Sequence, residues 1–270
     1  MTMSVGGDRG DLDERVEHDD LDDAQLLRYS RHILLDDLGV EGQRRIVRGH
    51  ALVIGAGGLG SPVLLYLASA GVGTITLVDH DTVDRTNLQR QIAHTDARVG
   101  WPKVTSAAAT VAAINPEVRV RAMQQRADAA SLDAWVAEAD LVLDCSDNFA
   151  TRHAVNAACV AHRKPLVSGA AIGFDGQISV WDARGEAHPC YACVFPPDAG
   201  MEEVRCATMG VFAPLVGIIG TMQAAEALKL LAGIGTSLAG RLQMLDGRTL
   251  EWTEIRVARD PACTVCGKRH

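Results

Sequence analysis

The sequence predicts an α/β fold, a doubly wound, Rossmann-like and mostly parallel sheet with an antiparallel C-terminal extension. Three observations lead to this prediction. Short apolar strands alternate with helices between residues 50 and 171. A glycine-rich turn, GAGGLGS at 55–61, directly follows the first of these strands. The 270 residues are 47% hydrophobic, which suffices for the core of one large domain.

The expected elements follow one another at the pitch of a parallel sheet. In the first half we expect strands at 50–55, 74–79, 118–123, 139–145 and 165–171, with helices near 60–70, 102–114, 131–137 and 150–162. In the second half we expect antiparallel strands at 176–181, 241–246 and 249–257, with an apolar helix over 211–232. Residues 24–270 are therefore predicted to form one continuous domain.

Almost all of the net charge of −8 lies in residues 1–23, which hold nine acids and two arginines. We expect this segment to be an acidic, disordered tail. The remaining chain has no basic stripe, so nucleic acid is not expected as a main partner. The N-terminus lacks an apolar leader, and charges interrupt the apolar stretch 210–233. We therefore expect no membrane association and a cytoplasmic location.

The glycine-rich turn has the pattern of a nucleotide phosphate loop. Gly55 permits the tight turn, Gly57 lets backbone N–H groups approach phosphate, and Gly60 lets the helix pack on the strand. Asp79 ends the second strand about 20 residues further on, where an acid usually binds ribose hydroxyls. NAD and ATP share these features. The turn alone leaves open an NAD(P)-dependent oxidoreductase and an enzyme that uses ATP.

Further polar residues favour phosphate chemistry over hydride transfer. Asn87 and Arg90 lie in NLQRQ, Lys103 opens the next helix, and Asp147 and Asn148 follow the fourth strand. The carboxyl ends of parallel strands meet at one edge, so we expect these groups to face one ligand. Arginine and lysine bind triphosphates, and aspartate binds Mg²⁺.

Two C-x-x-C pairs predict a structural zinc site. The ligands are Cys190 and Cys193 in CYAC, and Cys263 and Cys266 in CTVC. Four thiolates complete a tetrahedral zinc centre and leave no position open for catalysis. Redox activity is the competing interpretation, but neither pair is expected to open a helix after a strand.

Three cysteines remain. Cys145 and Cys159 lie in an apolar strand and a helix, which predicts core packing. Cys206 lies in a polar segment beside Arg205, so a reactive thiolate and an inert loop cysteine both stay open.

Together these motifs resemble the ThiF/MoeB/HesA family, bacterial relatives of the ubiquitin-activating enzymes, with MoeB members nearest in pattern. The resemblance runs from about residue 24 to the end and includes DCSDNFATR at 144–152. It implies an adenylyltransferase. Such an enzyme uses Mg·ATP to adenylate the C-terminal glycine of a small ubiquitin-like sulfur carrier protein ending in Gly-Gly, and releases pyrophosphate. The implied pathways are molybdenum cofactor (molybdopterin), thiamine or related sulfur-transfer biosynthesis.

The resemblance also implies roles for individual residues. The glycine turn, with Gly58, would hold the phosphates, and Asp79 would hold the ribose. The phosphates would also contact Asn87, Arg90 and Lys103, while Asp147 would bind Mg²⁺ with Asn148 beside it.

Two further residues match family positions outside the nucleotide turn. Arg31, in RYSRH, matches an arginine that reaches the ATP site of a neighbouring subunit, which implies a homodimer. Cys206 matches a cysteine that forms a covalent link with the carrier in some relatives. No histidine is assigned, because the attacking carboxylate is already ionised at neutral pH. Some relatives carry a rhodanese domain, absent here, so we expect a separate sulfur donor, a rhodanese or a cysteine desulfurase.

Three other functions account for part of the sequence pattern. An NAD(P)-dependent oxidoreductase leaves Arg90, Lys103 and Asp147 without a purpose. A zinc-stapled scaffold for a ubiquitin-like partner would not need those charges either. A relative that activates a carboxylate on modified tRNA is disfavoured by the missing basic surface. The sequence does not choose among sulfur carriers.

Replacing Cys206 by alanine is expected to leave adenylation intact, because attack by a carboxylate on ATP needs no thiol. ATP–pyrophosphate exchange by the purified Cys206→Ala protein checks this expectation. Loss of exchange in a folded Cys206→Ala protein would contradict it.

Overall fold

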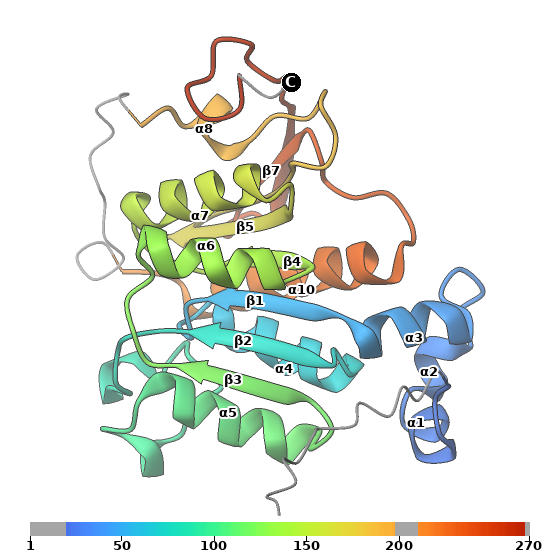
Figure 1. Ribbon diagram of the computed structural model, residues 1–270. Helices are drawn as coiled ribbons and strands as arrows, with labels where there is room; N and C mark the ends of the chain where they lie inside the picture. The colour runs from blue at the N-terminus through green and yellow to red at the C-terminus, as the bar shows by residue number, and fades with distance from the viewer. Residues whose placement is uncertain (1–19, 198–209, 268–270) are drawn as a thin grey trace, which may run out of the picture.

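The computed structural model describes residues 20–197 and 210–267, which form an eight-stranded sheet with helices on both faces (Figure 1). The strand order is β3-β2-β1-β4-β5-β6-β7-β8. The pairs from β3 to β5 are parallel, and those from β5 to β8 are antiparallel. The predicted fold class, a mostly parallel sheet with an antiparallel C-terminal extension, is confirmed.

The elements lie close to their expected places. The strands are His50–Ile54 (β1), Thr74–Val78 (β2), Arg119–Met123 (β3), Leu141–Asp144 (β4), Pro165–Ile172 (β5), Asp175–Asp182 (β6), Arg241–Asp246 (β7) and Glu251–Arg256 (β8). The helices are Asp23–Arg28 (α1), Ser30–Ile33 (α2), Gly39–Arg48 (α3), Gly60–Ala70 (α4), Lys103–Ile114 (α5), Ala129–Glu138 (α6), Phe149–Ala161 (α7), Tyr191–Val194 (α8) and Ala213–Ala232 (α10). Two short 3₁₀ helices, Arg85–Asn87 (η1) and Asp96–Arg98 (η2), fill the irregular segment before α5.

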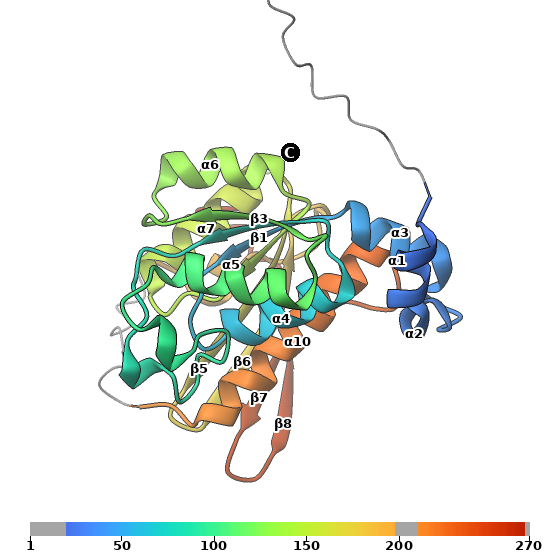
Figure 2. The same ribbon diagram turned by 90° about the horizontal axis from the view of Figure 1, so that it is seen from below.

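Side chains of each central strand alternate between two cores, as the pleat of a strand requires. In β1, Val53 packs in the core shared with α4, α5 and α10. Leu52 and Ile54 pack in the core shared with α6 and α7. Figure 2 shows these two sets of helices on opposite faces of the sheet. Burial on both faces explains why β1, β2 and β4 are largely apolar.

Helix α10 is long and apolar enough to cross a membrane, and among the described residues it alone has this property. Here it packs against α3, α4 and strands β4–β6, and much of its surface is buried inside the protein. Its apolar composition therefore fits the interior of the fold, as expected for 211–232.

The N-terminal region holds the main difference from the expected elements. Helix α3 was not predicted, because GVEGQRRIVR contains two glycines and four charged residues, and Ile46 is its one buried large apolar residue. Asp22 caps α1 through the N–H of Gln25, whose side chain bonds back to Asp22. Asp20 pairs with Arg44 of α3. Most of the predicted tail, residues 1–19, lies outside the described residues.

Helix α10 approaches α4 closely at a glycine. A Cβ atom built on Gly220 would lie 2.5 Å from the carbonyl oxygen of Leu59 and 2.5 Å from a ring carbon of Pro62. Gly217, one turn earlier on the same helix, has no heavy atom within 4 Å of such a Cβ. The close approach of α10 to α4 thus depends on Gly220 and not on Gly217.

This pair of glycines gives a matched test of the packing. Gly220→Ala is expected to destabilise the fold by about 1–3 kcal/mol, because the helices must separate. Gly217→Ala is expected to stabilise it by up to about 1 kcal/mol, the difference in helix propensity. Urea unfolding of both variants measures the two effects. Equal effects would show that α10 does not contact α4 as described.

Candidate functional site

The carboxyl ends of β1 and β4 mark the place where the strand order reverses. From β1 the parallel sheet grows through β2 and β3 on one side and through β4 and β5 on the other. Loops that leave the two strands at such a point diverge to opposite faces and leave a crevice that commonly binds ligands. The glycine turn follows β1, and the segment with Asp147 follows β4.

Backbone contacts explain two of the glycines in the turn. Gly55 has a φ angle of 102°, a conformation that side chains rarely allow. A Cβ atom on Gly60 would lie 2.0 Å from the carbonyl oxygen of Gly55, so α4 starts directly against the strand end. A Cβ on Gly58 would lie 3.0 Å from Val216 of α10. Gly57 meets just the Gln91 side chain, at 3.6 Å.

The turn offers unused hydrogen-bond donors. Helix α4 begins after Leu59, which provides no side-chain cap. Within the part of the chain that the structure describes, no acceptor is found for the N–H groups of Gly57 and Gly58. Free N–H groups at a helix N-terminus attract anions, above all phosphate. The residues present therefore fit a nucleotide phosphate.

Asp79 holds the turn from the side of β2. Its Oδ2 accepts the N–H of Ala56 at 2.7 Å, and its Oδ1 accepts the N–H of Asp81 at 2.8 Å. The carboxylate is partly exposed. Each oxygen retains a free lone pair, so these bonds leave room for ribose hydroxyls.

Lys103 lies at the start of α5 and is 5% exposed. Its Nζ lies 3.0 Å from Oδ2 of Asp81, and its backbone N–H donates to the Asp81 carbonyl at 2.9 Å. Burial acts to raise the pKa of Asp81, but the hydrogen bond and charge of Lys103 outweigh it and hold that pKa below its usual value. Asp81 thus fixes the lysine in place.

The NLQRQ segment folds back on itself. Gln91 is buried and donates from Nε2 to Oδ1 of Asn87 at 2.8 Å. Arg90 is partly buried and donates to the Thr86 carbonyl at 3.5 Å, close to the limit for a hydrogen bond. The Arg90 guanidinium therefore keeps most of its donors for other groups.

The segment after β4 is shaped by two members of the DCSDNFATR motif. Asp144 accepts the N–H and the hydroxyl of Ser146 at 2.9 and 2.6 Å. Buried Arg152 donates to the Ser146 carbonyl at 2.7 Å. These bonds present Asp147, which is exposed. Asn148 caps α7 by accepting the N–H of Thr151 at 2.8 Å, a structural role that sequence reasoning did not identify.

Arg31, which was predicted for the site, lies away from the glycine turn in a single chain. Arg31 is exposed on α2, which lies at the end of the sheet opposite to the arrowheads of β1–β3 (Figure 1). Cys206 lies outside the described residues.

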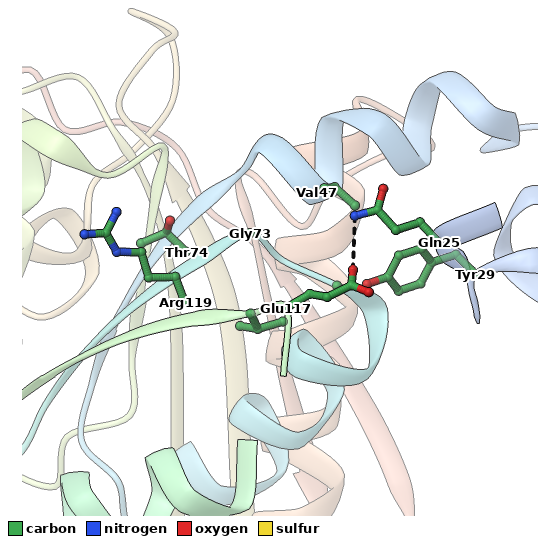
Figure 3. A pocket seen from close by; sticks show the side chains of 9 residues that line it. Gln25, Tyr29, Val47, Gly73, Thr74, Glu117 and Arg119 are labelled. Carbon is green, nitrogen blue, oxygen red and sulfur yellow. Dashed lines mark hydrogen bonds between the residues drawn. The ribbon is translucent and has the colours of Figure 1, made fainter. Parts of the chain in front are cut away.

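Two cavities among the described residues lie at the amino edge of the sheet, away from the glycine turn. One, of about 230 Å³, opens between α1 and the start of β2 and is lined by Tyr29, Thr74 and Glu117 (Figure 3). Gln25 donates to Glu117 across it at 3.0 Å. A second, of about 420 Å³, lies beside Arg45, Asp140 and Arg184. Beside the second cavity, Arg45 and Arg184 are paired with acids or a carbonyl, which leaves them few free donors for an anion.

The two C-x-x-C pairs meet as predicted. Sulfur atoms of Cys190 and Cys263 lie 3.8 Å apart, those of Cys193 and Cys266 3.4 Å, and those of Cys190 and Cys193 4.0 Å. Zinc–sulfur bonds of about 2.3 Å in a tetrahedron place sulfurs roughly 3.8 Å apart, so the cluster fits zinc. Asn156 donates to the Cys190 sulfur at 3.6 Å, a contact typical of residues that orient a metal ligand.

The thiol pKa values within the cluster are shifted in opposite directions: that of Cys193 is lowered, whereas those of Cys190 and Cys263 are raised. The hydrogen bond between Cys190 and Cys193 lowers the pKa of the Cys193 thiol to about 4, and burial opposes this shift. Cys190 precedes the one-turn helix α8, which was not expected, but a loop and not a strand leads into it. The arrangement thus differs from a redox C-x-x-C site.

Cys145 and Cys159 pack in the cores as predicted, and burial raises the pKa of both thiols. Neither thiol is poised to react.

Three residues near the turn were missed in the sequence: Asp81, Gln91 and His94. Asp81 lies two residues after Asp79, and Gln91 ends the NLQRQ motif. Both positions therefore adjoin residues that the sequence motifs had already marked. His94 carried no signal, because its contacts are made with Ala56 and with Ser106 of α5, which lie far from it along the chain.

The ThiF family model matches residues 29–265.

The chain belongs to the ThiF family.

Three curated relatives match over nearly their whole length. The molybdopterin-synthase adenylyltransferase of Escherichia coli (strain K12) is 46% identical over 249 residues, 92% of this chain and 99% of that protein. The sulfur carrier protein ThiS adenylyltransferase of the same strain is 46% identical, with 92% and 97% covered. The SAMP-activating enzyme E1 of Haloferax volcanii is 45% identical, with 92% and 91% covered.

Solved structures support the fold. Escherichia coli MccB with ATP matches with a TM-score of 0.77 at 24% identity, covering 89% of this chain and 75% of that one. PaaA matches with a TM-score of 0.77 at 22% identity, covering 92% and 78%. The shared architecture is that of the sheet and its flanking helices.

The cysteine cluster predicts one bound zinc per chain. Cys193→Ser is expected to lose the metal, because oxygen replaces one of four thiolates. Cys159→Ala, a buried cysteine outside the cluster, is expected to keep it. Metal analysis of the purified proteins measures the stoichiometry. Full zinc content in Cys193→Ser would contradict the assignment.

Proposed function

We propose that the protein is an adenylyltransferase that activates a small ubiquitin-like sulfur carrier protein. It transfers AMP from ATP to the C-terminal glycine carboxylate of the carrier and releases pyrophosphate. One observation carries the proposal: free N–H groups of the glycine turn lie at the switch point of the sheet, and Lys103, Arg90 and the exposed Asp147 lie on segments that follow the neighbouring strands β2 and β4. The names and high identity of the curated relatives support the same activity.

This reaction depends on correctly placed reactants and on positive charge near the phosphates more than on a general base. The carrier carboxylate oxygen forms a bond to the α-phosphorus, and the bond from that phosphorus to the bridging oxygen of pyrophosphate breaks. Negative charge grows on the leaving pyrophosphate. Lys103 and Arg90 would neutralise this charge, and the N–H groups of Gly57 and Gly58 would hold phosphate oxygens. Asp79 would hold the ribose, and Asn87 would contact the phosphates.

Two metals belong to the proposal. Asp147, presented by the turn after β4, would bind Mg²⁺, which supplies positive charge to the phosphates when bound. Asn148 lies beside it. Zinc in the cysteine cluster would link the segment 263–266 to Cys190 and Cys193, at the start of and within helix α8. Its distance from the turn in the fold fits a structural role.

A homodimer would complete the site. In one chain Arg31 lies far from the glycine turn, so a second copy is needed to bring it to the phosphates. Exposed leucines lie near it in the sequence: Leu27 is 77% exposed, Leu34 70% and Leu35 55%. Such apolar side chains are commonly covered at an interface.

The remaining parts of the proposal concern the pathway. The carrier would serve molybdenum cofactor, thiamine or related sulfur-transfer biosynthesis in the cytoplasm, with sulfur supplied by a separate rhodanese or cysteine desulfurase. Cys206 would act after adenylation, by forming a covalent link with the carrier.

ATP–pyrophosphate exchange tests the proposal. The wild-type protein with Mg²⁺ is expected to exchange pyrophosphate into ATP with one candidate carrier that ends in Gly-Gly. Asp147→Asn is expected to lower the rate at least about 100-fold, because Mg²⁺ binding is lost. Asp133→Asn, the same change on an exposed acid of α6, is expected to leave the rate unchanged.

The outcomes separate the alternatives. Exchange with one carrier alone would establish adenylation and identify the pathway. Absence of exchange with every carrier, from protein that binds ATP, would contradict the proposal and favour a binding scaffold. Binding of NAD(P) in place of ATP would revive the oxidoreductase.

A further inference from the structure

The peptide group between Ala56 and Gly57 has a partner outside the turn. The Ala56 carbonyl oxygen accepts a hydrogen bond from Nε2 of His94 at 2.8 Å. Ala56 is fully buried, and His94 is 6% exposed. A trans peptide is planar, with its C=O and N–H pointing in opposite directions. The bond from His94 therefore aims the N–H of Gly57 away from the ring, and this N–H has no acceptor among the described residues.

Both ring nitrogens of His94 are in use. A carbonyl oxygen can only accept, so Nε2 carries the hydrogen and Nδ1 is the acceptor. Nδ1 lies 3.0 Å from the hydroxyl of Ser106, which is fully buried in α5. Ser106 lies one helical turn after Lys103, the first residue of α5. The ring thus joins the phosphate turn to the helix that carries the lysine.

The surroundings keep the ring neutral. Burial, followed by the charges of Lys103 of α5 and Arg98 of η2, lowers the pKa of His94. The bond to Ala56 and the charge of Asp79, at the end of β2, oppose this shift. A neutral ring has one donor and one acceptor, which matches its two partners.

We propose that His94 is a positioning residue for nucleotide binding, which holds the Ala56–Gly57 peptide so that the N–H of Gly57 faces the phosphates. Asp79 holds the preceding peptide through the Ala56 N–H, so two successive peptides of the turn are each fixed by one side chain. Preformed donors bind an anion more tightly than donors that must first be ordered. The inference rests on the proposed function insofar as the ligand is a nucleotide.

Two variants separate the effect of losing the hydrogen-bond donor to Ala56 from the effect of losing the imidazole ring. His94→Gln loses the ring but places an amide nitrogen where Nε2 was, within reach of Ala56. His94→Asn loses the ring as well, but its shorter side chain reaches the place of Nδ1 and leaves the carbonyl of Ala56 without a donor. If His94→Asn does not fold, His94→Phe, which fills the volume of the ring without a donor, takes its place in the comparison.

The test is binding of a non-hydrolysable ATP analogue with Mg²⁺ to the full chain without any carrier, measured by calorimetry. His94→Asn is expected to bind about tenfold more weakly than the wild type, the value of one hydrogen bond. His94→Gln is expected to bind nearly as tightly as the wild type. Hydrogen exchange of residues 56–60 without nucleotide is expected to become faster in His94→Asn alone.

Equal affinity in the wild type and His94→Asn, or equal weakening in both variants, would overturn the positioning role and leave the proposed function standing. Absence of ATP binding by the wild type would overturn the proposed function, and the inference with it.

Discussion

The candidate site depends on two backbone contacts that leave no room for side chains. Helix α4 starts so close to the end of β1 that a Cβ on Gly60 would meet the Gly55 carbonyl. Helix α10 lies so close to α4 that a Cβ on Gly220 would meet the carbonyl of Leu59. Together these contacts place the uncapped end of α4 directly at the sheet edge. The segments after β2 and β4, which carry Asp79, Lys103 and Asp147, leave the sheet at the same edge.

The electrostatics of the site follow from this arrangement. Several polar groups near the turn are held by partners before any nucleotide binds: Lys103 by Asp81, Asn87 by Gln91, and the backbone before Asp147 by Asp144 and Arg152. Groups fixed in this way need little reorganisation when charge develops on a leaving phosphate, which is how electrostatic catalysis is most effective. Asp81 also balances the charge of a buried lysine, which would otherwise be costly to bury.

Local patterns in the sequence were enough to predict the parallel core and the cysteine cluster. Strand alternation, the glycine spacing and the C-x-x-C pairs are properties of short segments, and each was found in its expected place. Helix α3 was missed because its sequence is rich in charged residues and glycine, and it is stabilised by packing against α10 and α2. His94 was missed because its role arises from contacts with Ala56 and Ser106, which only the folded chain brings together. The role of Arg31 cannot be read from one chain, because the residue lies far from the turn.

A crystal structure with Mg²⁺ and a non-hydrolysable ATP analogue would test the central claim most directly, that the turn after β1 holds a nucleoside triphosphate. The account predicts the ribose on Asp79, phosphate oxygens on the N–H groups of Gly57 and Gly58, and Mg²⁺ on Asp147. Lys103 would contact the phosphates from α5. A nucleotide bound in a cavity at the amino edge of the sheet, with the glycine turn empty, would contradict the account.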